Sequence, residues 1–131
     1  HQAGADLTIA NRTVSKAADL AADLAPGSNV VGLDDLQEAL RTTEIAVNAT
    51  SMGHGGEGVL LPPGEGRLFY DLTYGHAAES VLGVARDNGW RTEDGLRMLV
   101  EQARISFNLW TGANPDPEPA LKICRNALGL S

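Results

Sequence analysis

Short apolar runs alternate with amphipathic segments over the first two thirds of the chain. The runs predict strands over 6–10, 29–32, 44–48, 67–71 and 90–92. Between them, apolar residues recur at helical spacing, first at Ala17, Leu20, Ala21 and Leu24, and then within 34–40 and 78–85. Such alternation of strands and helices predicts an α/β fold with a largely parallel sheet, helices on its faces and right-handed crossovers.

The last third of the chain has a different pattern. From 95 to 110, two apolar sets leave only a narrow polar stripe, so this helix needs cover on most sides. A small sheet cannot supply that cover, and we expect part of the helix to pack against something outside the chain. A proline-containing linker then leads to a final amphipathic helix over 120–128. The uncovered apolar face also favours self-association, so a homodimer is one candidate assembly.

Composition removes several classes of partner. The 131 residues hold 10 Lys and Arg against 17 Asp and Glu, a formal net charge of −7, and the basic residues are scattered. Nucleic acids and anionic membranes require clustered basic residues, so we expect neither as a partner. No run of 18 apolar residues is present, which predicts a soluble, cytoplasmic protein. A single cysteine, Cys124, and three histidines without ligand spacing predict no metal site.

The start of the chain is unusual. It begins at His1, and Gly4 has the place of a glycine that ends a helix just before the first predicted strand. We therefore expect the chain to be a fragment of a longer protein.

The turn after the first strand is the first candidate site. In dinucleotide-binding folds an acidic residue at this strand end accepts a hydrogen bond from the adenosine 2′-hydroxyl, whereas arginine accommodates a 2′-phosphate. Here the turn contains Asn11, Arg12 and Thr13, and Lys16 follows one helical turn later. Thr13 can cap the following helix with its hydroxyl. The pattern favours NADP over NAD, with an ordinary solvated turn as the alternative.

Polar residues at two other strand ends are also candidates. Asn48 interrupts an apolar strand end and needs a partner, either a backbone group or a ligand. The following Gly53–Gly58 segment does not open a helix, so a phosphate cradle is not expected there, and His54 is interpreted as a surface residue. Tyr74 follows the fourth strand and can bind a substrate oxygen or simply pack at a rim.

Gln102 places an amide on the apolar stripe of the 95–110 helix, one turn after Met98. A buried amide must be hydrogen-bonded, either to a loop carbonyl or to a ligand. Across the whole chain, no general acid and base pair can be assembled from the candidates. We therefore expect the chain to supply only half of an active site.

Five segments in order along the chain resemble the shikimate dehydrogenase family, the two-domain NADP-dependent enzymes that reduce 3-dehydroshikimate. They are Leu7–Thr13, Val47–Gly53, Tyr70–Tyr74, Asp94–Ala103 and Ser106–Gly112. The resemblance implies a truncated Rossmann-like three-layer α/β/α fold with a mostly parallel sheet, plus C-terminal helices. Residues 1–112 would form an incomplete NADP-binding domain. Residues 113–131 would form a linker and a helix that packs toward an N-terminal domain absent from the chain.

The resemblance also implies roles for individual residues. Asn11, Arg12, Thr13 and Lys16 match the turn that holds the adenosine 2′-phosphate, Thr50 and Ser51 match the loop along the cofactor, and Leu72, Gly95 and Met98 match the nicotinamide pocket. Tyr74 and Gln102 match substrate contacts. The family's glycine-rich diphosphate loop and its catalytic Lys and Asp are not in this sequence, so we expect no catalytic residue here.

The function that follows is the reversible, NADP-dependent reduction of 3-dehydroshikimate to shikimate by the full-length parent, with the chain alone inactive. Two alternatives stay open. The parent could be a quinate/shikimate dehydrogenase, whose NAD-using members would carry an acid where Arg12 stands. The isolated chain could also be only a cofactor-binding or folding module without turnover.

Overall fold

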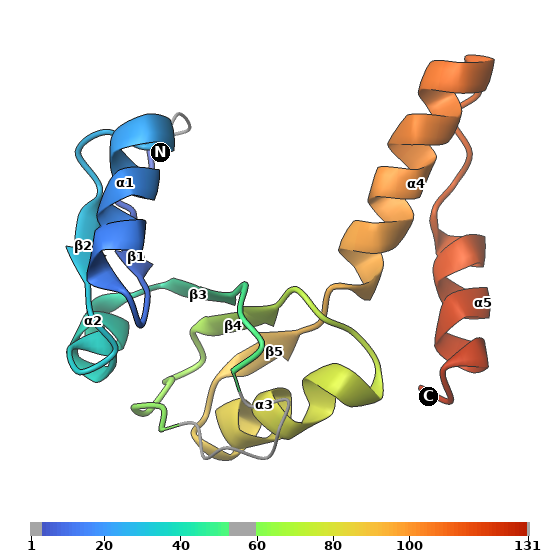
Figure 1. Cartoon of the computed structure of the whole chain (residues 1–131). Coiled ribbons are helices and arrows are strands. Elements are labelled where there is room, and N and C mark those ends of the chain that lie inside the picture. Colours follow the sequence, from blue (N-terminus) through green and yellow to red (C-terminus); the bar gives the residue numbers. More distant parts are fainter. Residues whose placement is uncertain (1–3, 53–59, 131) are drawn as a thin grey trace. The chain divides into compact units, whose positions relative to one another are not determined.

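The structure, a computed structural model, describes residues 4–52 and 60–130 (Figure 1). The chain folds as two compact units, residues 1–43 and 44–131. The described strands form two sheets, one in each unit, and every strand pair is parallel. The predicted α/β fold is therefore confirmed, with its parallel strands divided between two sheets.

The first unit is a strand, helix, strand arrangement with one further helix. Its elements are β1 (Thr8–Ala10), α1 (Val14–Leu24), β2 (Asn29–Val31) and α2 (Leu36–Thr42). β1 pairs with β2 in parallel, with Ile9 opposite Val30. Helix α1 forms because alanines and leucines recur at helical spacing, and it buries Ala17 and Ala21. Gly4 has a φ of +84°, but the helix end predicted before it involves residues outside the described part.

The second unit has a three-stranded parallel sheet in the order β3, β4, β5. Its elements are β3 (Ile45–Asn48), β4 (Leu68–Asp71), α3 (His76–Asp87), β5 (Arg91–Glu93), α4 (Leu96–Thr111) and α5 (Glu118–Ala127). Helix α3 packs against β4 and β5 and buries Ala78, Val81, Leu82 and Ala85. The register places Asn48 directly opposite Asp71, so the last residues of β3 and β4 are neighbours.

Trp90 fixes the other end of this sheet. Its indole is 3% exposed and meets the Phe69 ring edge to face, with centroids 6.1 Å apart. The indole N–H donates a hydrogen bond of 2.8 Å to the Pro62 carbonyl, and the Arg67 guanidinium lies 4.7 Å from the ring centroid. These contacts hold the segment before β4 against this end of the sheet.

Helices α4 and α5 lie side by side at the end of the chain (Figure 1). Leu96 and Val100 of α4 pack with Leu121 of α5 in a small buried cluster. Beyond this contact, large apolar side chains of α4 stay exposed, including Leu109 at 78% and Trp110 at 82%. The predicted excess of apolar surface on this helix is therefore present.

Candidate functional site

The turn after β1 is shaped by Asn11. Its side-chain oxygen accepts a hydrogen bond of 2.9 Å from the Thr13 backbone N–H, and α1 begins one residue later. Thr13 occupies the N-cap position, but its side chain makes no capping hydrogen bond. The expectation that its hydroxyl caps the helix is therefore wrong, because the Asn11 side chain, and not that of Thr13, stabilises the turn.

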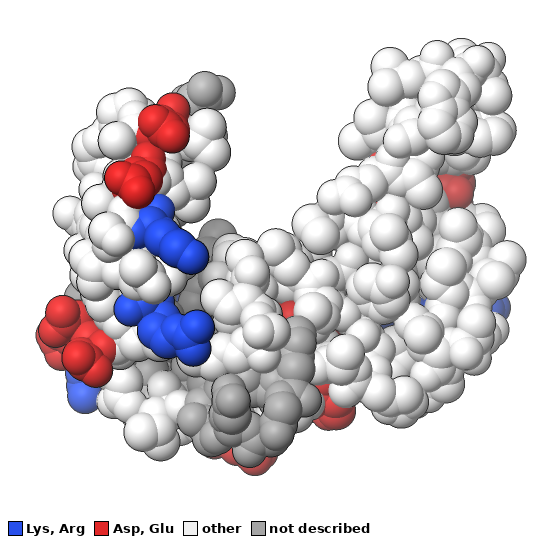
Figure 2. Space-filling view, in the orientation of Figure 1, with Lys and Arg blue, Asp and Glu red and all other residues white. Residues whose placement is uncertain are grey.

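Arg12 in this turn and Lys16 in the first turn of α1 are both exposed cations. Figure 2 shows basic side chains gathered beside the start of α1, and acidic ones near its far end. Within the described residues neither Arg12 nor Lys16 forms an ion pair, whereas the third basic residue of this unit, Arg41, pairs with Glu38 at 3.2 Å. Two uncompensated cations four residues apart suit a compact, doubly charged anion.

Asn48 and Asp71 form a buried polar pair at the ends of β3 and β4. Asn48 is 7% exposed and Asp71 is fully buried. The Asn48 amide Nδ2 donates a hydrogen bond of 2.8 Å to Asp71 Oδ2. The sequence predicted a backbone or ligand partner for Asn48; its amide oxygen does meet the Thr50 backbone, but its amide nitrogen meets a side-chain carboxylate that was not predicted. Asp71 was not among the predicted site residues, although its place at the end of the next strand was the available signal.

Each member of the pair also holds the loop that follows its own strand. Asn48 Oδ1 accepts hydrogen bonds from the Thr50 backbone N–H at 3.1 Å and from the Thr50 hydroxyl at 2.7 Å. Asp71 Oδ1 accepts the same two kinds of bond from Thr73, at 2.8 and 2.6 Å. The Thr50 hydroxyl thus donates its single proton to Asn48, and its oxygen also accepts a hydrogen bond of 3.0 Å from the Met52 backbone N–H.

Gly95 joins this edge of the sheet to α4. A Cβ atom at this position would lie 2.1 Å from the Leu72 carbonyl oxygen and 2.7 Å from its carbon. The Gly95 N–H donates a bond of 2.7 Å to the Thr73 carbonyl. Asp94 adds a second tie, because its carboxylate accepts from the backbone N–H groups of Leu96 at 3.1 Å and Gly75 at 3.4 Å. The loop after β4 is thereby packed directly on the start of α4.

Tyr70 lies beside the same helix start. Burial raises the pKa of its phenol above the ordinary value of 10.0, and the carboxylates of Asp94 and Glu93 raise this pKa further. A hydrogen bond with the Met98 backbone acts in the opposite direction. The phenol is therefore a neutral group at physiological pH.

The other predicted residues of the second unit differ in exposure. Met98 is half-buried, whereas Thr50, Ser51, Leu72, Tyr74 and Gln102 are exposed. The expectation that Gln102 is a buried amide is wrong, because the apolar stripe on which it lies is itself largely uncovered. Its predicted contact with substrate stays a prediction. The structure brings Leu72 and Gly95 into contact, and places Thr50 and Tyr74 on the two loops held by the Asn48–Asp71 pair.

Some predictions concern residues outside the described part of the chain. His1 and the Gly53–Gly58 segment with His54 belong to this group. Among residues 4–52 and 60–130, no group of three or more His, Cys, Asp or Glu is arranged to hold a metal ion. In the same residues, every helix is too short or too polar to cross a bilayer.

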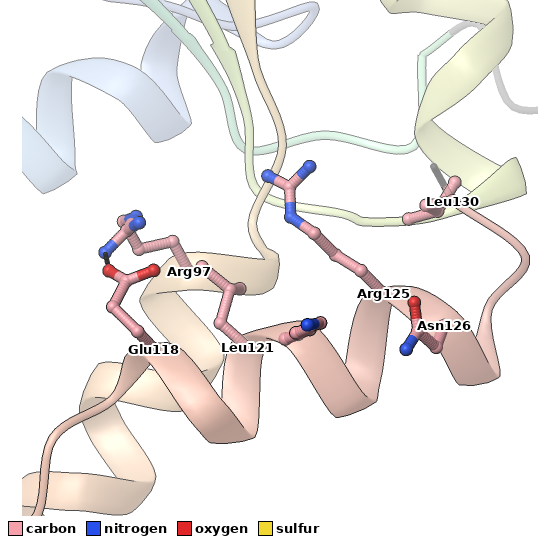
Figure 3. A pocket seen from close by; sticks show the side chains of 7 residues that line it. Arg97, Glu118, Leu121, Arg125, Asn126 and Leu130 are labelled. Atoms are coloured by element: carbon pink, nitrogen blue, oxygen red, sulfur yellow. Dashed lines mark hydrogen bonds and ion pairs between the residues drawn. The ribbon is translucent and has the colours of Figure 1, made fainter.

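A shallow pocket of about 360 Å³ lies between the start of α4 and α5 (Figure 3). Arg97 and Glu118 form an ion pair of 2.8 Å at one side of it, and Leu121 and Leu130 supply apolar walls. The residues that line this pocket include none of the predicted site residues. In the second unit, the candidate site is therefore the carboxyl edge of β3 and β4, since open α/β sheets place their ligands at this edge.

Two family descriptions match the chain. Residues 1–55 match shikimate / quinate 5-dehydrogenase, and residues 95–125 match the shikimate 5′-dehydrogenase C-terminal domain. A relative from Hyphomonas neptunium, named shikimate dehydrogenase (NADP(+)), is 52% identical over 122 residues, which cover 93% of this chain and 45% of that protein. The chain thus spans about half the length of the curated relatives it matches.

Solved structures agree with these matches. Shikimate 5-dehydrogenase from Thermus thermophilus, in complex with NADP(H) and shikimate, is 32% identical with a TM-score of 0.77, and the match covers 96% of this chain and 48% of that one. Quinate dehydrogenase from Corynebacterium glutamicum, in complex with NAD, is 28% identical with a TM-score of 0.70, over 89% and 45% of the two chains. The sequence, the fold and these similarities together show that the chain belongs to the shikimate dehydrogenase family.

Proposed function

We propose that this chain is the cofactor-binding half of an NADP-dependent shikimate dehydrogenase, which reversibly reduces 3-dehydroshikimate to shikimate. The observation that carries the proposal is the pair of exposed cations, Arg12 and Lys16, that have no ion-pair partner within the described residues of an acidic chain. The names of the relatives support the same cofactor and substrate.

The residues of the first unit would hold the 2′-phosphate of NADP. The Arg12 guanidinium can donate two parallel hydrogen bonds to phosphate oxygens, and Lys16 adds a second positive charge. Asn11 and Thr13 set the turn from which Arg12 projects. An acidic residue at this place would instead suit the unphosphorylated ribose of NAD.

The residues of the second unit would line the nicotinamide pocket and contact the substrate. Because Gly95 has no side chain, its backbone approaches that of Leu72 closely, and Met98 is half-buried on the next helical turn. Leu72 and Met98 would present apolar surface and exclude water. Tyr74 and Gln102 would donate hydrogen bonds to substrate oxygens, and Thr50 and Ser51 would lie along the cofactor.

NADPH would supply a hydride to the substrate's carbonyl carbon, and the oxygen would then require a proton. Asp71 is fully buried and its carboxylate oxygens are bonded to Asn48 and Thr73, so its side chain cannot reach the substrate oxygen to act as the proton donor. We therefore place the proton donor outside this chain. The chain would bind the cofactor and orient it, and by itself would show no turnover.

The cofactor assignment is tested by titrating NADPH and NADH into the 131-residue chain by calorimetry. We expect Arg12→Ala to weaken NADPH binding about 10- to 100-fold, since a hydrogen bond to a charged group contributes about 1.5–3 kcal/mol. NADH binding should change little. Arg41→Ala removes the same charge from the same unit and is the matched control. Equal loss of affinity for both nucleotides would contradict the 2′-phosphate assignment.

The activity is tested in a chimera. The chain replaces the segment of the Hyphomonas neptunium enzyme that it matches, and NADPH oxidation is followed with 3-dehydroshikimate. Turnover with NADPH, and little with NAD and quinate, is the expected result. Preference for quinate and NAD would favour a quinate dehydrogenase instead. Turnover by the 131-residue chain alone would refute the assignment of the proton donor to another part of the protein.

A further inference from the structure

A continuous series of hydrogen bonds crosses the carboxyl edge of the second unit's sheet. It runs from the loop after β3, through the buried Asn48–Asp71 pair, to the loop after β4. From there, the bond between the Gly95 N–H and the Thr73 carbonyl continues it to the start of α4. The series therefore ties together three loops that follow three neighbouring elements.

Burying the Asn48–Asp71 pair costs free energy unless its polar atoms are hydrogen-bonded. A fully buried carboxylate loses its hydration, and a structure tolerates one when every oxygen is hydrogen-bonded. Asp71 meets this condition with the Asn48 amide on Oδ2 and the Thr73 N–H and hydroxyl on Oδ1. An apolar pair at these two positions would fill the same space but would leave both loops without their anchors.

The loops held in this way carry the residues to which the proposed function assigns the cofactor and the substrate. Thr50 is bonded directly to Asn48. Leu72 and Tyr74 flank Thr73, which is bonded directly to Asp71. The Leu72 N–H also donates a bond of 3.0 Å to the Asn48 carbonyl, so the two loops are linked by main chain as well as by side chains.

We propose that Asn48 and Asp71 are positioning residues, which fix the two loops in the arrangement that binds the nicotinamide end of the cofactor. This inference rests on the proposed function. Both side chains act through the residues they hold, since neither is exposed enough to contact a ligand. Cofactor affinity should therefore depend on having one amide donor and one carboxylate acceptor at these two positions.

An exchange of the two residues tests this dependence. In Asn48→Asp, two carboxylate oxygens replace the bonded pair, and like charges repel in a buried site. In Asp71→Asn, two amide groups meet, and the single amide oxygen introduced at 71 cannot serve both Thr73 and Asn48. In the double exchange, the amide at 71 donates to the carboxylate at 48, and both loops regain their acceptors. The double variant thereby restores the hydrogen bond of the wild-type pair, with the carboxylate on β3 and the amide on β4.

The variants are compared in the chimera and, for binding, in the 131-residue chain with NADPH as the probe. We expect each single variant to raise the KM for NADPH, and its Kd, by about tenfold or more, with a smaller change in kcat. The double exchange should return both to within about threefold of the unmodified protein. Single variants that keep the unmodified KM and Kd, or a double variant as poor as the worse single one, would overturn the inference.

A control separates positioning from stability. Asn88 donates a bond of 2.8 Å from its side chain to the Val84 carbonyl at the far end of α3. Asn88→Ala should lower the melting temperature without raising the KM for NADPH. Equal rises in KM for Asn88→Ala and the single variants, at matched loss of melting temperature, would mean that the pair acts through stability alone.

Failure of this inference can be told apart from failure of the proposed function. If the unmodified chimera shows no turnover and the chain binds no NADPH, the proposed function fails. If the single variants do not fold, Thr73→Val removes the 2.6 Å hydroxyl bond to Asp71 and keeps the buried pair. We then expect about a threefold rise in KM from this variant together with recovery in the double exchange, and the absence of both would refute the inference.

Discussion

Replacing Gly95 with alanine should destabilise the second unit strongly, even though the substitution adds only one methyl group. The added Cβ would lie 2.1 Å from the Leu72 carbonyl oxygen, whereas ordinary contact begins at 3.4 Å. Because the neighbour is backbone, rotation of a side chain cannot relieve the clash. The start of α4 must move away from the loop after β4, and the 2.7 Å bond from the Gly95 N–H to Thr73 is lost.

The expected loss follows from these two terms. Overpacking costs about 1–3 kcal/mol, and the lost hydrogen bond about 1 kcal/mol, which gives about 2–4 kcal/mol in unfolding free energy. At on the order of 4 °C per kcal/mol, the melting temperature should fall by about 8–16 °C.

Urea unfolding of the chain, followed by circular dichroism, measures this free energy. Gly83→Ala is the matched control, because nothing lies within 4 Å of a Cβ at that position inside α3. That substitution should stabilise the chain by up to about 1 kcal/mol through helix propensity. The steric reasoning is refuted if Gly95→Ala costs less than about 1 kcal/mol, or if the two alanine variants behave alike.

Three further predictions concern aromatic residues. In the Tyr74→Phe variant, absorbance titration should show Tyr70 ionising above pH 10.0. The free energy of unfolding should fall as the pH rises above that value. A titration midpoint at or below 10.0 would contradict the argument that burial raises the pKa of Tyr70. Trp90→Phe removes the donor to the Pro62 carbonyl and should cost about 1–3 kcal/mol in urea unfolding, and an unchanged midpoint would argue against this bond. Because Trp110 is 82% exposed, Trp110→Gln should weaken any self-association of the chain in sedimentation experiments, and equal association of both proteins would exclude this side chain from the contact.

Local sequence pattern was enough to locate the elements and their order. Apolar spacing placed each described strand and helix to within a few residues, because these patterns reflect local periodicity. The surplus of apolar residues on α4 could also be predicted from the sequence, since it depends only on how apolar positions are distributed around one helix. The motifs themselves led to the family, which the comparisons then confirmed.

Which groups meet depended on the packing of those elements. Asn48 plainly needed a partner, but Asp71 lies 23 residues further along, and parallel pairing of β3 and β4 is what places the two side by side. The sequence also predicted the wrong helix cap at Thr13 and a buried Gln102, because a cap depends on one side-chain rotamer and burial depends on what covers a face. Local pattern limits which residues can form an element, whereas distances between strand ends, and hence the tight contact of Gly95 with Leu72, arise only when the elements pack.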